Sequence, residues 1–255
     1  MQNAMDYPSV VFLSTLVAMS LSAWIGASVL RRVKSLSAES REDFNVVQAA
    51  TLTLLALMIG FSFSMAVGRY DQRKNYEEEE ANAIGTEYVR ADLLPSADAQ
   101  QVRVLLTRYI EQRVLFYRTR DAQELEQINT TTTQLQAGLW AAVRDAAAAQ
   151  PNPVTALAVA GMNDVLNAQG YTQAAWWNRI PIAAWGLMVA IAVCCNLLVG
   201  YGARTAKVGL TLLVVLPVVV ATSFALIADI DSPRGGIIRV SPINLVSTAQ
   251  SLRPS

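Results

Sequence analysis

Residues 46–68 read VVQAATLTLLALMIGFSFSMAVG, a run of 23 residues without one charged side chain. A helix needs about 20 apolar residues to cross a hydrocarbon core of about 30 Å. A single charge near the centre would oppose insertion by about 2.5–3.5 kcal/mol, so the absence of charge decides the interpretation. The run is predicted to be a transmembrane helix.

Three further uncharged runs of similar length occupy residues 8–30, 180–203 and 208–228. Each is long enough to span a bilayer. The first is not typical of a signal peptide, because no basic residue precedes it, its apolar part is too long and Arg31 follows it. Four transmembrane helices are therefore predicted, and Pro217 is expected to kink the last of them.

Residues 69–179, between the second and third runs, have a polar composition that is rich in helix-forming residues. Apolar residues at helical spacing predict an amphipathic helix that opens with Ser96 as its cap, and Ala122–Ala149 is predicted to form a second helix. The second membrane helix is expected to continue to about Leu94, since Pro95 marks a clear break.

The fold class that follows is an all-α membrane protein with four transmembrane helices in two hairpins and an inserted soluble helical bundle. We expect such a chain to be homo-oligomeric. A turn rich in proline and glycine after the last span, followed by a Ser-Pro pair, predicts a short final helix that packs on the bundle. The expected organisation is a first transmembrane hairpin at 8–68, a soluble helical segment at 69–179, a second transmembrane hairpin at 180–228, and a C-terminal turn and short helix at 229–255.

The composition excludes several classes of function. Lysine plus arginine (20) balances aspartate plus glutamate (20), so the chain has no electrostatic footprint for nucleic acid. It contains no histidine, which removes the usual general base and most zinc sites. Cys194 and Cys195 lie inside an apolar run and act as small hydrophobes. No nucleophile and base pair, metal constellation or phosphate loop can be named, so we expect no catalytic site, no cofactor and no metal.

Small residues recur at four-residue spacing in the first two spans. The first stripe comprises Ser14, Ala18, Ser22 and Gly26, and the second comprises Gly60, Ser64 and Gly68. Such stripes let helix backbones approach closely, which is a main source of cohesion in lipid. The alternative is that the second stripe faces a pore, where an apolar ring can gate by excluding water. The pore-lining candidates are Gly60, Phe61, Phe63 and Ser64.

Four consecutive glutamates, Glu77–Glu80, follow the second span. Successive helical residues turn by about 100°, so these side chains encircle most of one turn. One interpretation is a solvated girdle, and the other is a ring of carboxylates around a symmetry axis that attracts cations. The run lacks the glycine turn and carbonyl ligands of a calcium loop, so it does not predict a metal site.

Several segments together resemble the bestrophin-like group of bacterial membrane proteins, also described as DUF4239. These segments are Gly60-Phe61, Val67–Asp71, Glu80–Thr86, Arg90–Pro95, Tyr109 with Arg113, and Asp231–Gly236. The resemblance covers nearly the whole chain. Within it, the residues expected to have a structural or gating role are Arg69, Asp71, Glu80, Asn82, Gly85, Arg90, Asp231, Pro233, Arg234 and Gly235.

The resemblance extends more distantly to the bestrophin anion channels, in which a Gly-Phe pair in the second span is likewise followed by an Arg-aromatic pair. It implies a homo-oligomer, a pentamer in those channels, whose second helices line a central pore for small inorganic ions. The bestrophin acidic calcium clasp has no counterpart in this sequence, and the soluble region is shorter. Calcium gating is therefore not implied.

The shared residues also have a purely structural interpretation. Arg69 and Asp71 are expected to pair, across the membrane boundary, with the aspartate or the arginine of the DSPRGG segment at 231–236. In the same interpretation, Asn82 and Gly85 permit close helix packing. Neither role requires contact with an ion.

Positive charges in the short loops bear on orientation. They are Arg31, Arg32, Lys34 and Arg41 in one loop, and Arg204 and Lys207 in the other. Both loops lie on one side of the membrane, and the positive-inside rule places them in the cytoplasm. We therefore expect a multi-pass protein of the bacterial inner membrane with its soluble segment outside the cytoplasm, although Arg69, Arg73 and Lys74 favour the opposite orientation by the same rule.

Two functions stay open at this point. An oligomeric ion channel or transport-type assembly, with the second transmembrane helix lining the pore, follows from the resemblance and from the phenylalanines of that helix. A non-conducting membrane scaffold or sensor, whose soluble helices bind a partner, is favoured by the lack of ionisable residues inside the spans. Residues that move substrates or protons through membranes are commonly ionisable.

Overall fold

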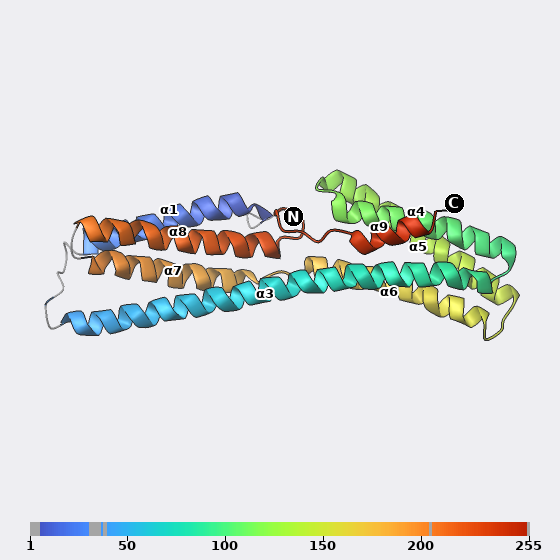
Figure 1. Cartoon of the computed structure of the whole chain (residues 1–255), viewed down its shortest axis with the longest axis horizontal. Coiled ribbons are helices and arrows are strands. Elements are labelled where there is room, and N and C mark those ends of the chain that lie inside the picture. The colour runs from blue at the N-terminus through green and yellow to red at the C-terminus, as the bar shows by residue number, and fades with distance from the viewer. Residues whose placement is uncertain (1–5, 31–36, 38–39, 204–205, 254–255) are drawn as a thin grey trace. The chain divides into compact units, whose positions relative to one another are not determined.

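The computed structural model describes residues 6–30, 37, 40–203 and 206–253, of which residues 206–212 are described by their backbone alone. Throughout these residues the regular structure is helical, without a β-strand. The chain divides into two compact units (Figure 1). We call Met1–Arg69 with Arg179–Arg239 the membrane unit, and Tyr70–Asn178 with Val240–Ser255 the bundle unit.

The membrane unit contains α1 (Pro8–Ile25) with its π-helical extension (Gly26–Leu30), the first part of α3 (Ser40–Arg90), α7 (Ile182–Gly202) and α8 (Ala206–Asp231). Within the described residues, four helical stretches are long and apolar enough to cross a membrane, one in each of these helices. The four predicted spans are thereby confirmed as helices. The backbone of α8 is helical on both sides of Pro217, so the proline does not end the helix.

Helix α1 packs on both α7 and α8. Its contact with α7 is built on two glycines whose backbones face the other helix. A Cβ atom on Gly26 would lie 2.1 Å from the carbonyl oxygen of Leu197, and one on Gly200 would lie 2.0 Å from that of Ala23. The hydroxyl of Ser22 donates a hydrogen bond to the carbonyl of Val193 at 2.7 Å. Close backbone approach through small residues thus holds α1 against α7.

The first small-residue stripe is therefore only partly a packing surface. Ser22 and Gly26 are buried, as packing requires, whereas Ser14 and Ala18 are exposed in the protomer. The arginines and lysines that bear on orientation at positions 31, 32, 34 and 204 lie outside the described residues, as does the side chain of Lys207.

The bundle unit contains the second part of α3, a 3-10 turn (Ala91–Leu93), α4 (Ser96–Arg118), α5 (Ala122–Ala149), α6 (Thr155–Trp177) and α9 (Ile243–Ser251). Helix α5 has the predicted bounds. It begins after Asp121, whose side chain accepts hydrogen bonds from the backbone of Gln123 (2.9 Å) and Glu124 (2.8 Å). Ser96 is the first residue of α4 and not its cap, which corrects the prediction by one position.

One apolar core joins the helices of the bundle unit. Its fully buried members include Ile84 of α3, Leu106 of α4, Leu139 of α5 and Met162 of α6. The C-terminal helix contributes Leu245, which is also fully buried. The prediction that the tail packs on the bundle is confirmed.

Candidate functional site

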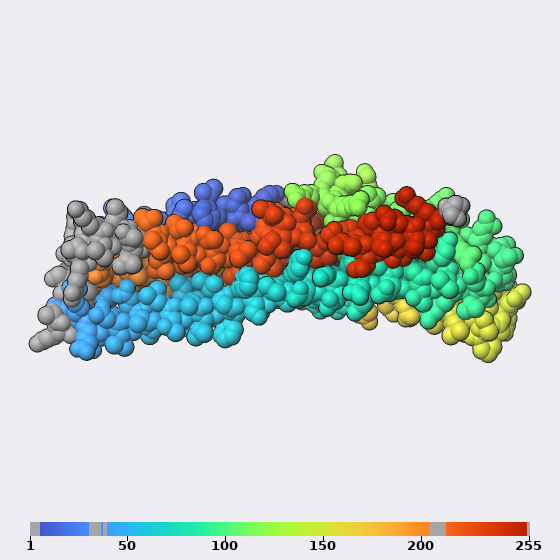
Figure 2. All heavy atoms as spheres, viewed as in Figure 1, coloured from blue at the N-terminus to red at the C-terminus, as the bar shows by residue number. Residues whose placement is uncertain are grey.

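The first part of α3 exposes most of its surface within the protomer (Figure 2). Between residues 40 and 69 its buried side chains are Leu55, Ser62 and Ala66. These positions are separated by seven and four residues, so they form one stripe along the helix. The other faces of this part of α3 are exposed or only partly covered by the rest of the protomer.

The pore-lining candidates lie mostly on the opposite face of α3. Gly60, Phe61 and Ser64 are exposed, and the ring of Phe61 is 63% accessible. Phe63, at 39%, is closer to the buried stripe. A Cβ atom on Gly60 or on Gly68 would meet no atom within 4 Å. The second small-residue stripe therefore makes no packing contact at its glycines inside the protomer, unlike Gly26 of the first stripe.

An ionic cluster surrounds Asp231 at the end of α8 in the membrane unit. The Asp231 carboxylate lies 3.8 Å from Nη1 of Arg69 and 3.6 Å from Nε of Arg179. It also accepts hydrogen bonds from the backbone N–H of Ile180, at 3.2 Å to each oxygen. Arg179 forms a second ion pair, with Asp6. The side chain of Asp231 is only 3% exposed, so these donors stabilise a nearly desolvated charge.

The cluster agrees with the expected pairing of Arg69 and Asp231, but Asp71 is exposed on the surface of the bundle unit. Sequence reasoning missed Arg179 and Asp6. The available signal was positional, because both residues border predicted spans just as Arg69 does. Nothing in their local sequence connects them to Asp231.

The DSPRGG segment forms a tight turn directly after α8. A Cβ on Gly235 would lie 1.8 Å from the carbonyl oxygen of Asp6, and one on Gly236 would lie 2.6 Å from that of Asp229. The Asp229 carboxylate accepts hydrogen bonds from the backbone of Ile237 (2.7 Å) and Ile238 (2.8 Å). Only glycine fits at both positions. Pro233 and Arg234 lie half-buried within the same turn.

Glu80 and Arg113 form an ion pair in the core of the bundle unit, and both side chains are 0% exposed. Nε of Arg113 donates to one oxygen of Glu80, and Nη2 lies 3.3 Å from the other. The hydroxyl of Thr172 also donates to Glu80, at 3.0 Å. Burial lowers the pKa of Arg113, but the charge of Glu80 and its hydrogen bond outweigh burial and hold that pKa above its ordinary value. Arg113 therefore keeps its positive charge beside Glu80.

Glu77 caps the C-terminal helix. Its carboxylate accepts hydrogen bonds from the backbone of Leu245 (2.9 Å) and from the side chain of Asn244 (2.7 Å). Burial raises the pKa of Glu77, while these hydrogen bonds lower it, and the net direction is upward. Glu78 and Glu79 are exposed. The solvated-girdle interpretation is therefore wrong for Glu77 and Glu80, which are buried, and holds for Glu78 and Glu79.

The remaining motif residues lie in different environments. A Cβ on Gly85 would lie 3.4 Å from Cγ2 of Thr248, which is an ordinary van der Waals contact, so the approach of α9 to α3 does not require a glycine here. Asn82 is exposed in the protomer, and its role stays a prediction. Arg90 forms an ion pair with Asp164 of α6 at 3.8 Å.

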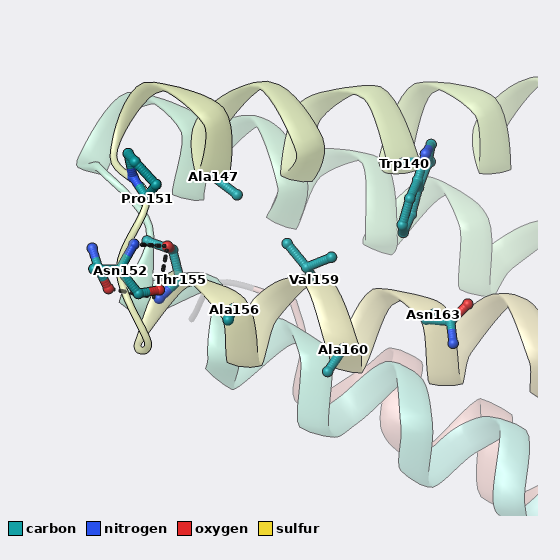
Figure 3. A pocket seen from close by; sticks show the side chains of 9 residues that line it. All are labelled: Trp140, Ala147, Pro151, Asn152, Thr155, Ala156, Val159, Ala160 and Asn163. Carbon is teal, nitrogen blue, oxygen red and sulfur yellow. Dashed lines mark hydrogen bonds between the residues drawn. The ribbon is translucent and has the colours of Figure 1, made fainter.

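A groove of about 540 Å³ opens between α5 and α6 in the bundle unit (Figure 3). Trp140 and Ala147 of α5 point into it toward α6, and Val159 of α6 points into it toward α5. Asn152 and Thr155 are hydrogen-bonded to each other in the turn that joins the two helices. No charged residue lines the groove, so it offers little for polar recognition. Among the described residues, no three His, Cys, Asp or Glu side chains are grouped to hold a metal ion.

The sequence model of the bestrophin-like domain matches residues 10–245. The chain belongs to the bestrophin-like family. This bestrophin-like chain is thus a multi-pass membrane protein, in agreement with its four apolar helices. No curated protein matches it.

Solved structures share the bestrophin-like fold at low sequence identity. A bacterial bestrophin homologue from Klebsiella pneumoniae is 14% identical, with a TM-score of 0.65 over 95% of this chain and 94% of that chain. A variant of that homologue is 11% identical, with a TM-score of 0.67 over 94% of this chain and 97% of that chain. A variant described as a membrane protein is 12% identical, with the same TM-score and coverage. At these identities the likeness shows the fold alone.

Proposed function

We propose that this bestrophin-like chain forms a homo-oligomeric ion channel in the bacterial inner membrane, with α3 of each copy lining a central pore. The carrying observation is the open face of α3, where Gly60, Phe61, Ser64 and Gly68 are exposed in the protomer and a Cβ on either glycine would meet no atom within 4 Å. Small residues are the ones that membrane helices use for close contact. Contact with lipid alone gives no reason for such a stripe.

In a closed ring of copies, the open face of α3 would contact the same helix of neighbouring copies. Cyclic symmetry would bring one α3 from each copy to a common axis, with small residues allowing close approach and Phe61 repeated as an apolar ring. Such a ring controls conduction by excluding water from a narrow constriction. The bestrophin likeness supports five copies, and the basic short loops support an extracytoplasmic bundle unit.

The ions are proposed to be cations. In the bundle unit α3 exposes the carboxylates of Asp71, Glu78 and Glu79. Repeated around an axis, carboxylates raise the local concentration of cations and oppose anions. Replacing Glu78 and Glu79 with glutamine is expected to lower the cation-to-anion permeability ratio several-fold, measured as a shift of reversal potential under a salt gradient. A ratio that stays unchanged would remove these carboxylates from the conduction path.

The channel itself is tested by flux from liposomes that contain the purified full chain. Phe61→Ala is expected to raise basal ion flux about tenfold, equivalent to about 1.4 kcal/mol of barrier, because the constriction widens and hydrates. Leu13→Ala is the matched control, since Leu13 of α1 is 59% exposed against 63% for Phe61 but lies on another helix.

Two results would contradict the channel. A monomer by light scattering would leave no shared axis for α3. A stable oligomer that conducts no ion, with or without Phe61→Ala, would favour the non-conducting scaffold or sensor, in which the same α3 face only holds the copies together.

A further inference from the structure

Glu87 of α3 is a buried carboxyl group in the bundle unit. Its side chain is 0% exposed, and neither of its oxygens has a hydrogen-bond partner among the described residues. The other buried glutamates of this helix, Glu77 and Glu80, each accept at least two hydrogen bonds. A buried carboxylate without donors is strongly disfavoured, so such a group holds its proton instead.

The space for this carboxyl group exists because residue 161 of α6 is a glycine. A Cβ atom on Gly161 would lie 2.1 Å from Oε2 of Glu87 and 2.5 Å from Nη1 of Arg90. The carboxyl group and the guanidinium group therefore occupy the same small space over α6. Nη1 of Arg90 lies 3.8 Å from Oδ2 of Asp164, whose side chain is 66% exposed. Arg90 is thus positioned between a buried acid and an exposed one.

Few charged groups act on Glu87. Burial raises the pKa of Glu87 to about 8, Arg90 of the same helix lowers it, and Asp164 of α6 raises it. The charged side chain that α4 places in the core is Arg113, which is already paired with Glu80. Whether Glu87 holds a proton therefore depends on its burial and on whether Arg90 pairs with Glu87 or with Asp164.

We propose that Glu87 is a proton-binding site that controls the contact between α3 and α6. With the proton bound, Glu87 is neutral and Arg90 stays with Asp164. When the proton leaves, the new carboxylate attracts Arg90 away from Asp164 and draws water to Gly161, which loosens α6 at this point. Every group in the site belongs to the bundle unit, and none of them is among the residues proposed to line the pore or to select its ions.

Infrared difference spectroscopy of the full chain in lipid, recorded from below to above pH 8, tests the proton directly. The carbonyl stretch of a protonated carboxyl group without hydrogen bonds should disappear with a midpoint near pH 8. Glu87→Gln should lack this band at every pH. Glu79→Gln is the matched control, because Glu79 is an exposed glutamate of the same helix, and this variant should keep the band.

The contact is tested by hydrogen exchange of α6, corrected for the intrinsic effect of pH. Amide protection around Gly161 should fall above the midpoint in the wild type and stay constant in Glu87→Gln. Protection that falls equally in both proteins, or a wild type without a titrating carboxyl band, would overturn the proposal.

Asp164→Asn gives a readout that does not depend on the folding of a core variant. It removes an exposed negative charge and releases Arg90, so the midpoint of the Glu87 band should move to lower pH by about one unit or less. An unchanged or higher midpoint would contradict the competition for Arg90.

Discussion

Replacing Arg113 with methionine is expected to destabilise the bundle unit by about 3–5 kcal/mol, because the carboxylate of Glu80 is then left buried without its cation. Both partners are 0% exposed, so water cannot replace the lost donor in place. Thr172 supplies a single hydrogen bond at 3.0 Å, which is insufficient compensation for a full charge. Thermal unfolding of the purified full chain in detergent, followed by tryptophan fluorescence, measures the loss. Trp176 reports on the site, since its ring lies 4.8 Å from that of Phe116, over which Arg113 is stacked.

A surface ion pair provides the control for this experiment. Arg144 and Asp145 of α5 have side chains that are 60% and 67% exposed, and pairs of this kind contribute about 0–1 kcal/mol. Arg144→Met should therefore leave the unfolding transition nearly unchanged. Combining Arg113→Met with Glu80→Met should recover most of the stability, because replacing both buried charges removes the desolvation cost. If the double variant is as unstable as Arg113→Met alone, side-chain packing and not the ion pair determines the stability of this part of the core.

The buried pair also illustrates what the sequence conceals. Glu77–Glu80 is a contiguous acidic run whose side chains encircle the helix. Such a run is typical of a helix surface that is in contact with water all round. Burial of Glu77 and Glu80 depends on partners that are far away in the chain, Asn244 for the first and Arg113 for the second. Helical spacing identifies which residues share a face, but it does not tell which distant element covers that face.

The spans and the bundle helices were predictable for the opposite reason. Their signals are local: the absence of charge over 46–68, the break at Pro95, and the polar, helix-forming composition of residues 69–179. The ionic cluster at Asp231 was predictable in part. Arg69 was identified through the family motif, whereas Arg179 reaches the same carboxylate because the start of the second hairpin lies beside the end of α8. The roles of the α3 candidates in conduction stay predictions.

The two small-residue stripes show the same limit within the membrane unit. Both have small residues at four-residue spacing, so their sequences predict the same behaviour. In the protomer Gly26 faces the backbone of α7, while Gly60 and Gly68 face open space. The difference comes from the position of α7, which no property of either stripe encodes. Substitutions at glycine therefore distinguish contacts inside one protomer from contacts between copies.

Gly200→Ala is expected to separate α1 from α7 and to destabilise the membrane unit by about 1–3 kcal/mol or more, because the new methyl group has no room. Its Cβ would lie 2.0 Å from the carbonyl oxygen of Ala23 and 3.0 Å from the amide nitrogen of Ala27. Both atoms belong to the backbone of the α1 segment, so no side-chain rotation relieves the clash. The measurement is the thermal stability of the full chain in detergent, together with the yield of monodisperse protein.

Gly186→Ala on the same helix is the matched control, since a Cβ there would meet no atom within 4 Å. It should leave stability within about 0.5 kcal/mol of the wild type. Gly60→Ala should behave like this control in the unfolding experiment, because Gly60 also faces open space in the protomer. If α3 lines a shared axis, however, Gly60→Ala will change oligomer stability or flux, whereas Gly186→Ala will change neither. If neither Gly60→Ala nor Gly186→Ala changes thermal stability, oligomer stability or flux, the open face of α3 contacts lipid and not a second copy.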